Sequence, residues 1–202
     1  MMEMLGTIIA FVTERWVDLV STLLGLGCVY LAGRGKVSNF WVGYVYCVFL
    51  FLLFMSKSLY ASMAIQTVAI VINAVGHYRW THPSAKEAQE DGTLAVTGLD
   101  KKEYAIYGAL IVAITAGLYF MLVHTDDAQP LLDATCTALI LTAQWLSAQK
   151  KTECWYVWIV VNITNFVLCV NAGLIFNPIK YALLLANGVW SLITWKKNER
   201  DS

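Results

Sequence analysis

The side chains best suited to chemistry lie on one stripe of an apolar stretch, Trp155-Tyr-Val-Trp158-Ile-Val-Val-Asn162-Ile-Thr-Asn165. On a helix that turns about 100° per residue, the two tryptophans and two asparagines share a face roughly 80° wide. Two indole rings beside two carboxamides suit a flat, polar ring, because aromatic faces stack on its plane and amides bond to its edge. A cationic ring would add a cation–π attraction of about 2 kcal/mol where it is desolvated.

Three carboxamides, Gln66, Asn162 and Asn187, lie at matched depth in three different apolar segments. Counted at 1.5 Å per residue from the nearest basic residue at a segment end, they are about 14 to 16 Å inside, near the middle of a hydrocarbon layer about 30 Å thick. Asn73 and Asn165 flank this level. An unpaired amide in hydrocarbon costs several kcal/mol, so each needs a partner. Hydrogen bonds between helices would explain any single carboxamide equally well, but carboxamides at one depth on several helices favour a shared polar site.

Ionisable side chains within the apolar segments are few. Asp133 and Lys180 lie near the outer ends of two segments, where they could pair, reach the interface or guard the outer mouth, and a structural role is favoured. No Asp or Glu lies near mid-depth, and His77, His82 and His124 stand at segment ends. Proton-coupled carriers usually keep an ionisable group in their pathway, so the sequence favours a uniporter. The five cysteines show no metal-binding spacing, and neither a metal nor a cofactor is expected.

The elements that must position these residues are membrane helices. The chain has 202 residues, of which 58% are hydrophobic and only 14% charged, and its mean hydropathy is +0.60. In a soluble domain about a quarter of the residues are usually charged, so this composition indicates a polytopic membrane protein. The formal net charge is zero and no block of like charge is present, which argues against a nucleic-acid partner. The sequence predicts one membrane domain, residues 1–202, without a soluble domain.

Seven segments are long and apolar enough to be predicted as membrane helices. The first dozen residues show no features of a cleaved signal peptide and are predicted to form a short interfacial helix. The polar segment 81–102 is predicted to be a loop with about one helical turn. The seven predicted helices cover residues 15–32, 38–56, 59–80, 103–123, 131–149, 155–172 and 177–195.

The distribution of Lys and Arg predicts the orientation of these helices. Eleven basic residues fall on the side reached after the first, third, fifth and seventh helices, against three on the other side. This bias predicts an outside N-terminus, a cytosolic C-terminus and a cytosolic 81–102 loop. The eleven are Arg34, Lys36, Arg79, Lys86, Lys101, Lys102, Lys150, Lys151, Lys196, Lys197 and Arg200, and the three are Arg15, Lys57 and Lys180.

An internal repeat is predicted from a shift of 114 residues, which places Trp41 on Trp155, Tyr44 on Trp158 and Asn73 on Asn187. Residues 15–80 form the first three-helix unit, 131–195 the second, and 103–123 an extra helix that returns the second unit to the orientation of the first. The result is a parallel 3+1+3 repeat, an arrangement of transporters whose substrate site lies near mid-membrane between the halves.

Short strings in fixed order resemble one family over roughly residues 16–195. They are Trp155-x-x-Trp158-x-x-x-Asn162, the run Leu59-Tyr60-Ala61-Ser62 followed by Gln66, then Asn73-x-x-Gly76, Asn187-Gly188, and Asp133 placed 22 residues before Trp155. In these residues the chain is similar to the Pnu-type vitamin transporters, and most of all to the PnuC-type nicotinamide riboside transporters.

The resemblance implies a seven-helix, SWEET-like fold in the bacterial cytoplasmic (inner) membrane, assembled as a homotrimer. It also implies facilitated diffusion of nicotinamide riboside, trapped by a separate cytosolic kinase and used in NAD biosynthesis. The substrate-binding residues that it implies are Gln66, Asn73, Trp155, Trp158, Asn162 and Asn187. Helix-face geometry adds Tyr44 and Asn165 to these.

Departures from the family pattern leave the cargo open. Gly76 is followed by His77 where the family often has Trp, and Lys180 stands where related chains can carry an acidic residue. Thiamine, another cationic planar vitamin, is the alternative cargo, and an enzyme is disfavoured because no His, Asp and Glu cluster shares one depth. Positions 48 and 51 are Val and Phe, so the helix at 155–172 is expected to supply more of the recognition than the helix at 38–56.

Overall fold

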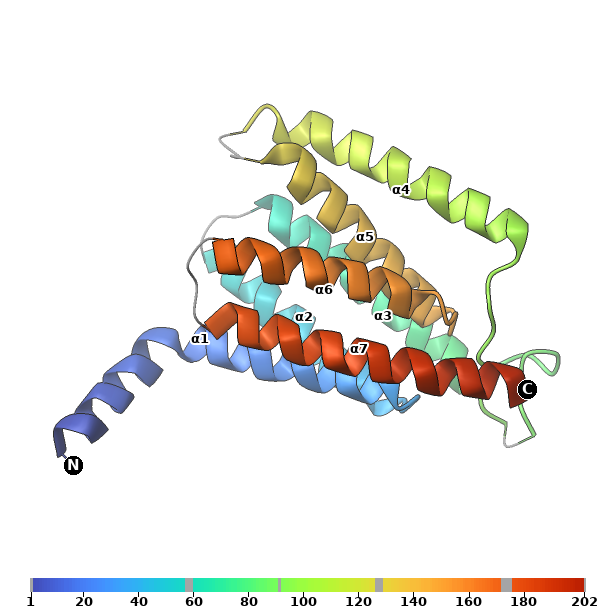
Figure 1. The fold of residues 1–202 in the computed structure, drawn as a ribbon, viewed down its shortest axis with the longest axis horizontal. Coiled ribbons are helices and arrows are strands. Elements are labelled where there is room, and N and C mark those ends of the chain that lie inside the picture. Colours follow the sequence, from blue (N-terminus) through green and yellow to red (C-terminus); the bar gives the residue numbers. More distant parts are fainter. Residues whose placement is uncertain (1, 57–59, 91, 126–128, 172–175, 202) are drawn as a thin grey trace.

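Seven α-helices and no named strand make up the described part of the chain, and all seven predicted membrane segments are confirmed as helices (Figure 1). The computed structural model describes residues 2–56, 60–90, 92–125, 129–171 and 176–201. The helices are α1 Met2–Gly33, α2 Ser38–Ser56, α3 Tyr60–Thr81, α4 Lys101–Leu122, α5 Pro130–Ala148, α6 Cys154–Asn171 and α7 Phe176–Asp201.

Three helix ends differ from the prediction by more than one residue, for local reasons. Helix α1 begins at Met2, so the first dozen residues are helical as predicted and run on into the first membrane helix, with no glycine or proline between positions 7 and 24 to end it. Figure 1 shows the N-terminal part bent away from the ring, and its place at the membrane interface stays a prediction. Helix α4 begins two residues early because Asp100 and Glu103 form a capping box at its start. Helix α7 continues to Asp201 through residues that favour helix.

The outer surface of the bundle is apolar. Exposed aliphatic side chains occur on several helices, for example Val45 on α2, Val112 on α4, Val160 on α6 and Ile193 on α7. Among the described residues, α2, α4 and α5 are long and apolar enough to cross a membrane, while the apolar parts of α1 and α6 are shorter, at Leu19–Gly33 and Cys154–Val170. The fold is therefore an all-α integral membrane bundle.

Six helices form a closed ring and the seventh lies outside it. The neighbouring pairs are α1–α2, α2–α3, α3–α5, α5–α6, α6–α7 and α7–α1, whereas α4 packs mainly on α5 and buries none of its described residues. The odd-numbered helices run in one direction and the even-numbered in the other (Figure 1). The order of neighbours in α1–α3 recurs in α5–α7, which favours the predicted 3+1+3 arrangement.

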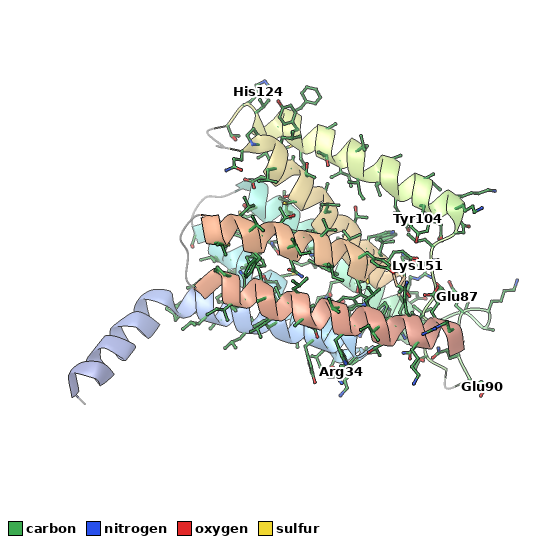
Figure 2. All side chains as sticks on the ribbon, viewed as in Figure 1. Arg34, Glu87, Glu90, Tyr104, His124 and Lys151 are labelled. Carbon is green, nitrogen blue, oxygen red and sulfur yellow. The ribbon has the colours of Figure 1, made fainter. Side chains whose placement is uncertain are left out.

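One end of the ring, called here the loop end, holds the turns after α1, α3 and α5 and the C-terminus (Figure 1). Figure 2 shows Arg34 and Lys151 at this end and His124 at the opposite one. The Arg34 guanidinium carbon lies 3.6 Å from the centroid of the Trp190 ring, a cation–π contact. The basic residues that the sequence assigned to one side of a membrane therefore gather at one end of the molecule.

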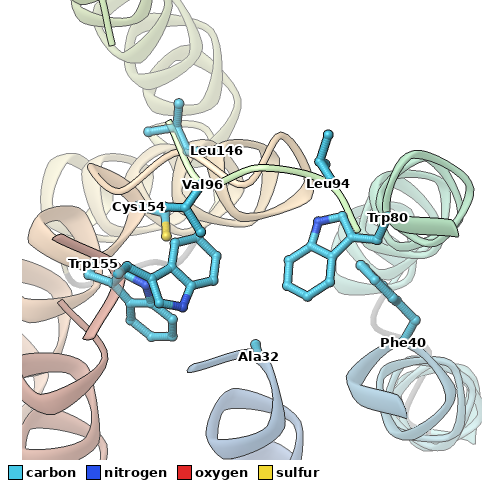
Figure 3. Packing of buried hydrophobic residues seen from close by; sticks show 9 residues of the cluster. Ala32, Phe40, Trp80, Leu94, Val96, Leu146, Cys154 and Trp155 are labelled. Atoms are coloured by element: carbon cyan, nitrogen blue, oxygen red, sulfur yellow. The ribbon is translucent and has the colours of Figure 1, made fainter. Parts of the chain in front are cut away.

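Buried aromatic residues close the loop end. The indole of Trp195 lies edge-on to that of Trp155, with 5.4 Å between ring centroids, and donates its N–H to the Gly33 carbonyl at 3.1 Å. Phe40 packs edge-on against Trp80 at 5.0 Å. We call this the end cluster (Figure 3), and its members are Ala32, Phe40, Trp80, Leu94, Val96, Leu146, Cys154, Trp155 and Trp195.

The segment between α3 and α4 is part of this core, although the sequence predicts only a polar loop. Leu94 and Val96 are buried in the end cluster. The Lys150 ammonium donates to the Leu94 carbonyl and lies 4.9 Å from the centroid of the Trp80 ring. Thr97 forms an isolated parallel bridge with Lys151, through Thr97 N to the Lys150 carbonyl at 3.2 Å. The loop therefore covers the end cluster.

The first part of the same loop is tied to α3 through Glu87. Its carboxylate accepts a hydrogen bond from the Ser84 hydroxyl at 2.7 Å and pairs with Arg79 at 2.8 Å. The Ser84 hydrogen bond and then the Arg79 charge lower the pKa of the Glu87 carboxyl. The backbone carbonyl of Ser84 accepts a hydrogen bond from the backbone N–H of Ala88 at 2.9 Å, which forms the expected single helical turn.

Candidate functional site

A cavity of about 420 Å³ runs along the axis of the six-helix ring. All six ring helices line it and α4 does not. On α2 the lining extends from Asn39 to Leu50, eleven residues or about 17 Å. Ala32, Phe40 and Trp155 belong to both the cavity wall and the end cluster, so the cluster closes the cavity toward the loop end. The volume is in the range of small-molecule sites, about 300 to 1,000 Å³.

Six of the eight predicted binding residues line this cavity: Gln66, Asn73, Trp155, Trp158, Asn162 and Asn165. They come from α3 and α6, which are separated in the ring by α5. All four residues of the stripe between positions 155 and 165 therefore line the cavity, as expected for residues that share one helix face. Tyr44 and Asn187 are not on the cavity wall.

Tyr44 and Asn187 contact protein instead. The Tyr44 hydroxyl lies 3.4 Å from His77 Nδ1, and its ring packs edge-on against Trp41. The Asn187 amide donates to the Val29 carbonyl of α1 at 3.3 Å. Both side chains contact a neighbouring helix. Such a contact between helices is the alternative role expected above for any single polar residue.

The lining carboxamides fall into two groups. Asn73 donates to the Phe40 carbonyl at 2.9 Å, and Asn165 donates to the Val161 carbonyl at 2.8 Å, so both amides are bonded to backbone. Within the described residues, the carboxamides of Gln66, Asn162 and Gln144 make no hydrogen bond to protein, although all three line the cavity. A polar group in an apolar interior needs a partner, so these three are available to a molecule in the cavity.

The two indoles of the stripe also differ. Trp155 is only 1% exposed, and packing against Trp195 occupies one edge of its ring, which makes it the floor of the cavity. Trp158 is half-buried, one turn farther from the end cluster, and lines the cavity wall. Of the two, Trp158 is the less buried, and it also packs against the end cluster.

Lining residues recur along the chain at a spacing of 115, not the predicted 114. Thirteen of the eighteen lining residues of α1–α3 have a lining counterpart 115 residues later, against three at 114, so the register is corrected by one residue. At 115 the counterpart of Trp158 is Gly43, which explains why Tyr44, one position on, points away from the cavity. Asn73 then corresponds to Gly188 rather than to Asn187.

The two halves supply unequal chemistry to matched positions. Opposite Trp158, Asn162 and Asn165 in the second half stand Gly43, Cys47 and Leu50 in the first. At these three positions α6 carries the polar and aromatic groups, whereas at the pair of Tyr46 and Val161 the aromatic group comes from α2. That α6 supplies more of the recognition than α2 stays a prediction.

Sequence reasoning missed two residues of the wall, Gln144 and Lys180. Gln144 continues a stripe of α5 with Thr137, Leu141 and Ala148, a spacing that identifies one helix face. Lys180 was expected near the outer end of its helix with a structural role, and the structure places it on the cavity wall. The described lining contains no Asp, Glu or His, and no metal-binding cluster occurs among the described residues.

Comparison with known proteins gives one family and one fold. Residues 15–197 match the family described as "Nicotinamide mononucleotide transporter". The nicotinamide riboside transporter PnuC of Neisseria mucosa is 27% identical over 95% of this chain and 76% of that protein. PnuC of Escherichia coli is 24% identical over 92% and 87%, and the riboflavin/roseoflavin transporter RibM of Streptomyces davaonensis is 26% identical over 93% and 88%. A crystal structure of the vitamin B3 transporter PnuC shares the fold, with a TM-score of 0.73 and 24% identity over 97% of this chain and 87% of that one.

Proposed function

The chain belongs to the nicotinamide mononucleotide transporter family, whose members are transporters and not enzymes, and from this we propose that it carries nicotinamide riboside into the cytosol across the bacterial inner membrane. The PnuC relatives supply the cargo, and one structural observation supports it. Inside an apolar bundle, an aromatic wall stands beside three carboxamides without a protein partner within the described residues. Such a wall is suited to a planar polar ring.

Nicotinamide riboside has a cationic pyridinium ring with an exocyclic carboxamide and a ribose. Stacking on Trp158 would hold the plane of the ring and add a cation–π attraction. The carboxamides of Asn162 and Gln66 each offer two donors and an acceptor, which match the amide and hydroxyl groups of the cargo. Asn73 and Asn165 shape the wall, and Trp155 closes its floor.

Transport by facilitated diffusion fits the composition of the wall. Proton-coupled carriers usually need an ionisable Asp, Glu or His in the pathway, and the described lining has none. Net uptake would then follow from removal of the cargo by a separate cytosolic kinase. The homotrimer and the orientation with an outside N-terminus are parts of the same proposal.

Riboflavin is a second candidate cargo, because one relative is a riboflavin/roseoflavin transporter. Thiamine, a cationic planar vitamin, is a further candidate on the chemistry of the wall. Each would use the same cavity, so they compete with nicotinamide riboside in one experiment.

The test is a titration of the purified full-length protein with nicotinamide riboside, thiamine and riboflavin, followed by tryptophan fluorescence or calorimetry. Binding of nicotinamide riboside should saturate, and Trp158→Ala should weaken the affinity about tenfold or more because the stacking contact is lost. Tight binding of thiamine or riboflavin with no binding of nicotinamide riboside would assign a different cargo. In proteoliposomes, uptake should equilibrate without an ion gradient, and accumulation that requires a gradient would exclude uniport.

A further inference from the structure

Gln144 on α5 places a carboxamide on the cavity wall at a position where packing does not require one. The side chain is half-buried, lines the cavity and makes no hydrogen bond to protein within the described residues. Its counterpart in the other half, 115 residues earlier, is Val29, which also lines the wall. An aliphatic side chain therefore fills the matched position, so the amide of Gln144 adds a hydrogen-bonding group rather than bulk.

Gln144 lies at the same level along the cavity as Trp158. Helices α5 and α6 are neighbours in the ring and run in opposite directions from the turn that joins them. Gln144 is four residues before the last residue of α5, and Trp158 is four residues after the first residue of α6. At 1.5 Å per residue, both lie about 6 Å from the loop end of their helices. An indole and an available amide therefore stand side by side on adjacent helices.

The other two available carboxamides lie farther from the loop end. Asn162 is eight residues after the start of α6, about 12 Å along the helix. On α3, Gly76 marks the level of the end of α5, because a Cβ added there would lie 2.9 Å from that of Ala148. Gln66 is ten residues from Gly76, about 15 Å. Of the three available amides, Gln144 is therefore the one level with Trp158.

Resting on the proposed function, we propose that Gln144 is a specificity-determining residue that binds the exocyclic carboxamide of the nicotinamide ring. A ring stacked on the Trp158 indole presents its edge to the neighbouring helix, which carries Gln144 at that level. The ring then lies in the loop-end part of the cavity. The ribose extends toward the middle of the cavity, where Asn162 and Gln66 offer donors and acceptors to its hydroxyls.

The chemistry of a carboxamide makes Gln144 selective for an amide over an acid. Each of the two carboxamides has N–H donors and a carbonyl acceptor, so Gln144 and the cargo can exchange two hydrogen bonds. Nicotinic acid riboside carries a carboxylate instead, which has acceptors only and would leave the Gln144 carbonyl oxygen without a donor. A site that bonds to an N–H group rejects an analogue that lacks it, because a polar group of the site is left unpaired.

The experiment is a binding titration of the full-length protein in nanodiscs with nicotinamide riboside, nicotinic acid riboside and pyridine riboside. Pyridine riboside keeps the cationic ring and the ribose but lacks the carboxamide. Gln144→Leu should weaken nicotinamide riboside about tenfold, because both hydrogen bonds are lost, and change pyridine riboside by less than about twofold. The preference for nicotinamide riboside over nicotinic acid riboside should fall by a similar factor in the same variant.

Gln66→Leu is the matched control, because it removes another available amide about 9 Å farther along the cavity. It should weaken nicotinamide riboside and pyridine riboside by the same factor, since both compounds carry the ribose. A selective loss of nicotinamide riboside in Gln66→Leu would place the carboxamide at Gln66 and overturn the assignment to Gln144.

Gln144→Met is a second variant of similar length should Gln144→Leu fail to give folded protein. A folded Gln144 variant that weakens nicotinamide riboside and pyridine riboside equally, or weakens neither, overturns the role of Gln144 and leaves the proposed function standing. Absence of nicotinamide riboside binding to the wild type overturns the proposed function and this inference together.

Discussion

Asn162 and Asn165 illustrate how two identical side chains one turn apart on α6 acquire different roles. The amide of Asn165 is bonded to the Val161 carbonyl of its own helix at 2.8 Å. Asn162 is 4% exposed and has no hydrogen-bond partner among the described residues. The helix face alone does not separate the two, because both lie on the same stripe. The hydrogen bonds do separate them, and they lead to a paired prediction.

Asn162→Ala should weaken nicotinamide riboside binding about tenfold, since it removes a cavity-facing amide that is not already bonded to protein. Asn165→Ala, the matched control on the next turn, should weaken it less than about threefold, because its amide is satisfied within α6. Calorimetry on both purified variants measures the difference. Equal losses in the two variants would show that the hydrogen bond to Val161 does not decide which asparagine takes part.

At the scale of elements, the loop between α3 and α4 depends on one buried amine. Lys150 is 7% exposed, has a backbone φ of 57°, and donates its Nζ to the Leu94 carbonyl. Its neighbour Lys151 donates to the Gly98 carbonyl at 3.0 Å and pairs with Glu103 at 3.0 Å. Two consecutive lysines after α5 therefore hold the loop on the end cluster.

Lys150→Met should release this loop, because the Leu94 carbonyl loses its charged donor while the apolar stem of the side chain is kept. The cost is about 1 to 3 kcal/mol of local stability. Hydrogen exchange of residues 93–98 should quicken by about tenfold or more, and the exposed Lys86→Met should leave it unchanged. Unaltered exchange in Lys150→Met would mean that Leu94 and Val96 hold the loop by packing alone.

The junction between α1 and α7 is the second element on which the cavity depends. A Cβ added at Gly33 would collide with the Ser191 hydroxyl and lie 3.1 Å from the Ser191 Cβ. The corresponding junction of α3 and α5 has Gly76, whose added Cβ would lie 2.9 Å from that of Ala148. Under the 115-residue spacing Gly33 corresponds to Ala148 and Gly76 to Ser191, so each junction between the halves has one glycine opposite a small residue, on opposite members of the pair.

Gly33→Ala should lower the thermal stability of the protein, because overpacking at a close helix crossing costs about 1 to 3 kcal/mol. Ser191→Gly in the same chain should recover part of the loss by making room for the methyl group. The matched control is Gly117→Ala on α4, where an added Cβ meets nothing within 4 Å. Thermal unfolding in detergent compares the three, and an equal melting temperature for Gly33→Ala and wild type would contradict the close contact.

At the scale of the whole molecule, the basic residues predict which end faces the cytosol. Eleven Lys and Arg lie near the ends of the odd-numbered helices or in the segments that follow them, and the C-terminus lies at that end (Figure 1). A fluorescent protein fused after Ser202 should therefore fluoresce, and alkaline phosphatase fused there should be inactive. The same reporters inserted between α4 and α5, at the opposite end, should give the reverse pattern. Active phosphatase at the C-terminus would invert the proposed orientation.

The sequence was sufficient for the helices and the polar stripe because both depend on local patterns. Hydropathy located α2 to the residue, and periodicity placed all four stripe residues on one wall. The local pattern could not predict that Leu94 is buried, because the ammonium that bonds to its carbonyl belongs to Lys150, 56 positions away. Asn187 shares a helix face with Lys180 and Leu184, yet it bonds to α1, because α1 and α7 converge toward Gly33 and Ser191.

The unequal halves of the cavity also limit how a cargo can lie within it. A ring of two equal halves would offer every asymmetric molecule two poses of the same energy, related by rotation about the axis of the ring. Here Trp158 and Asn162 stand across from Gly43 and Cys47, so one pose is favoured and the other is not. The lost degeneracy is worth only RT ln 2, roughly 0.4 kcal/mol. In return a cargo keeps a single setting about the axis of the ring, with the same side always turned toward Trp158 and Asn162.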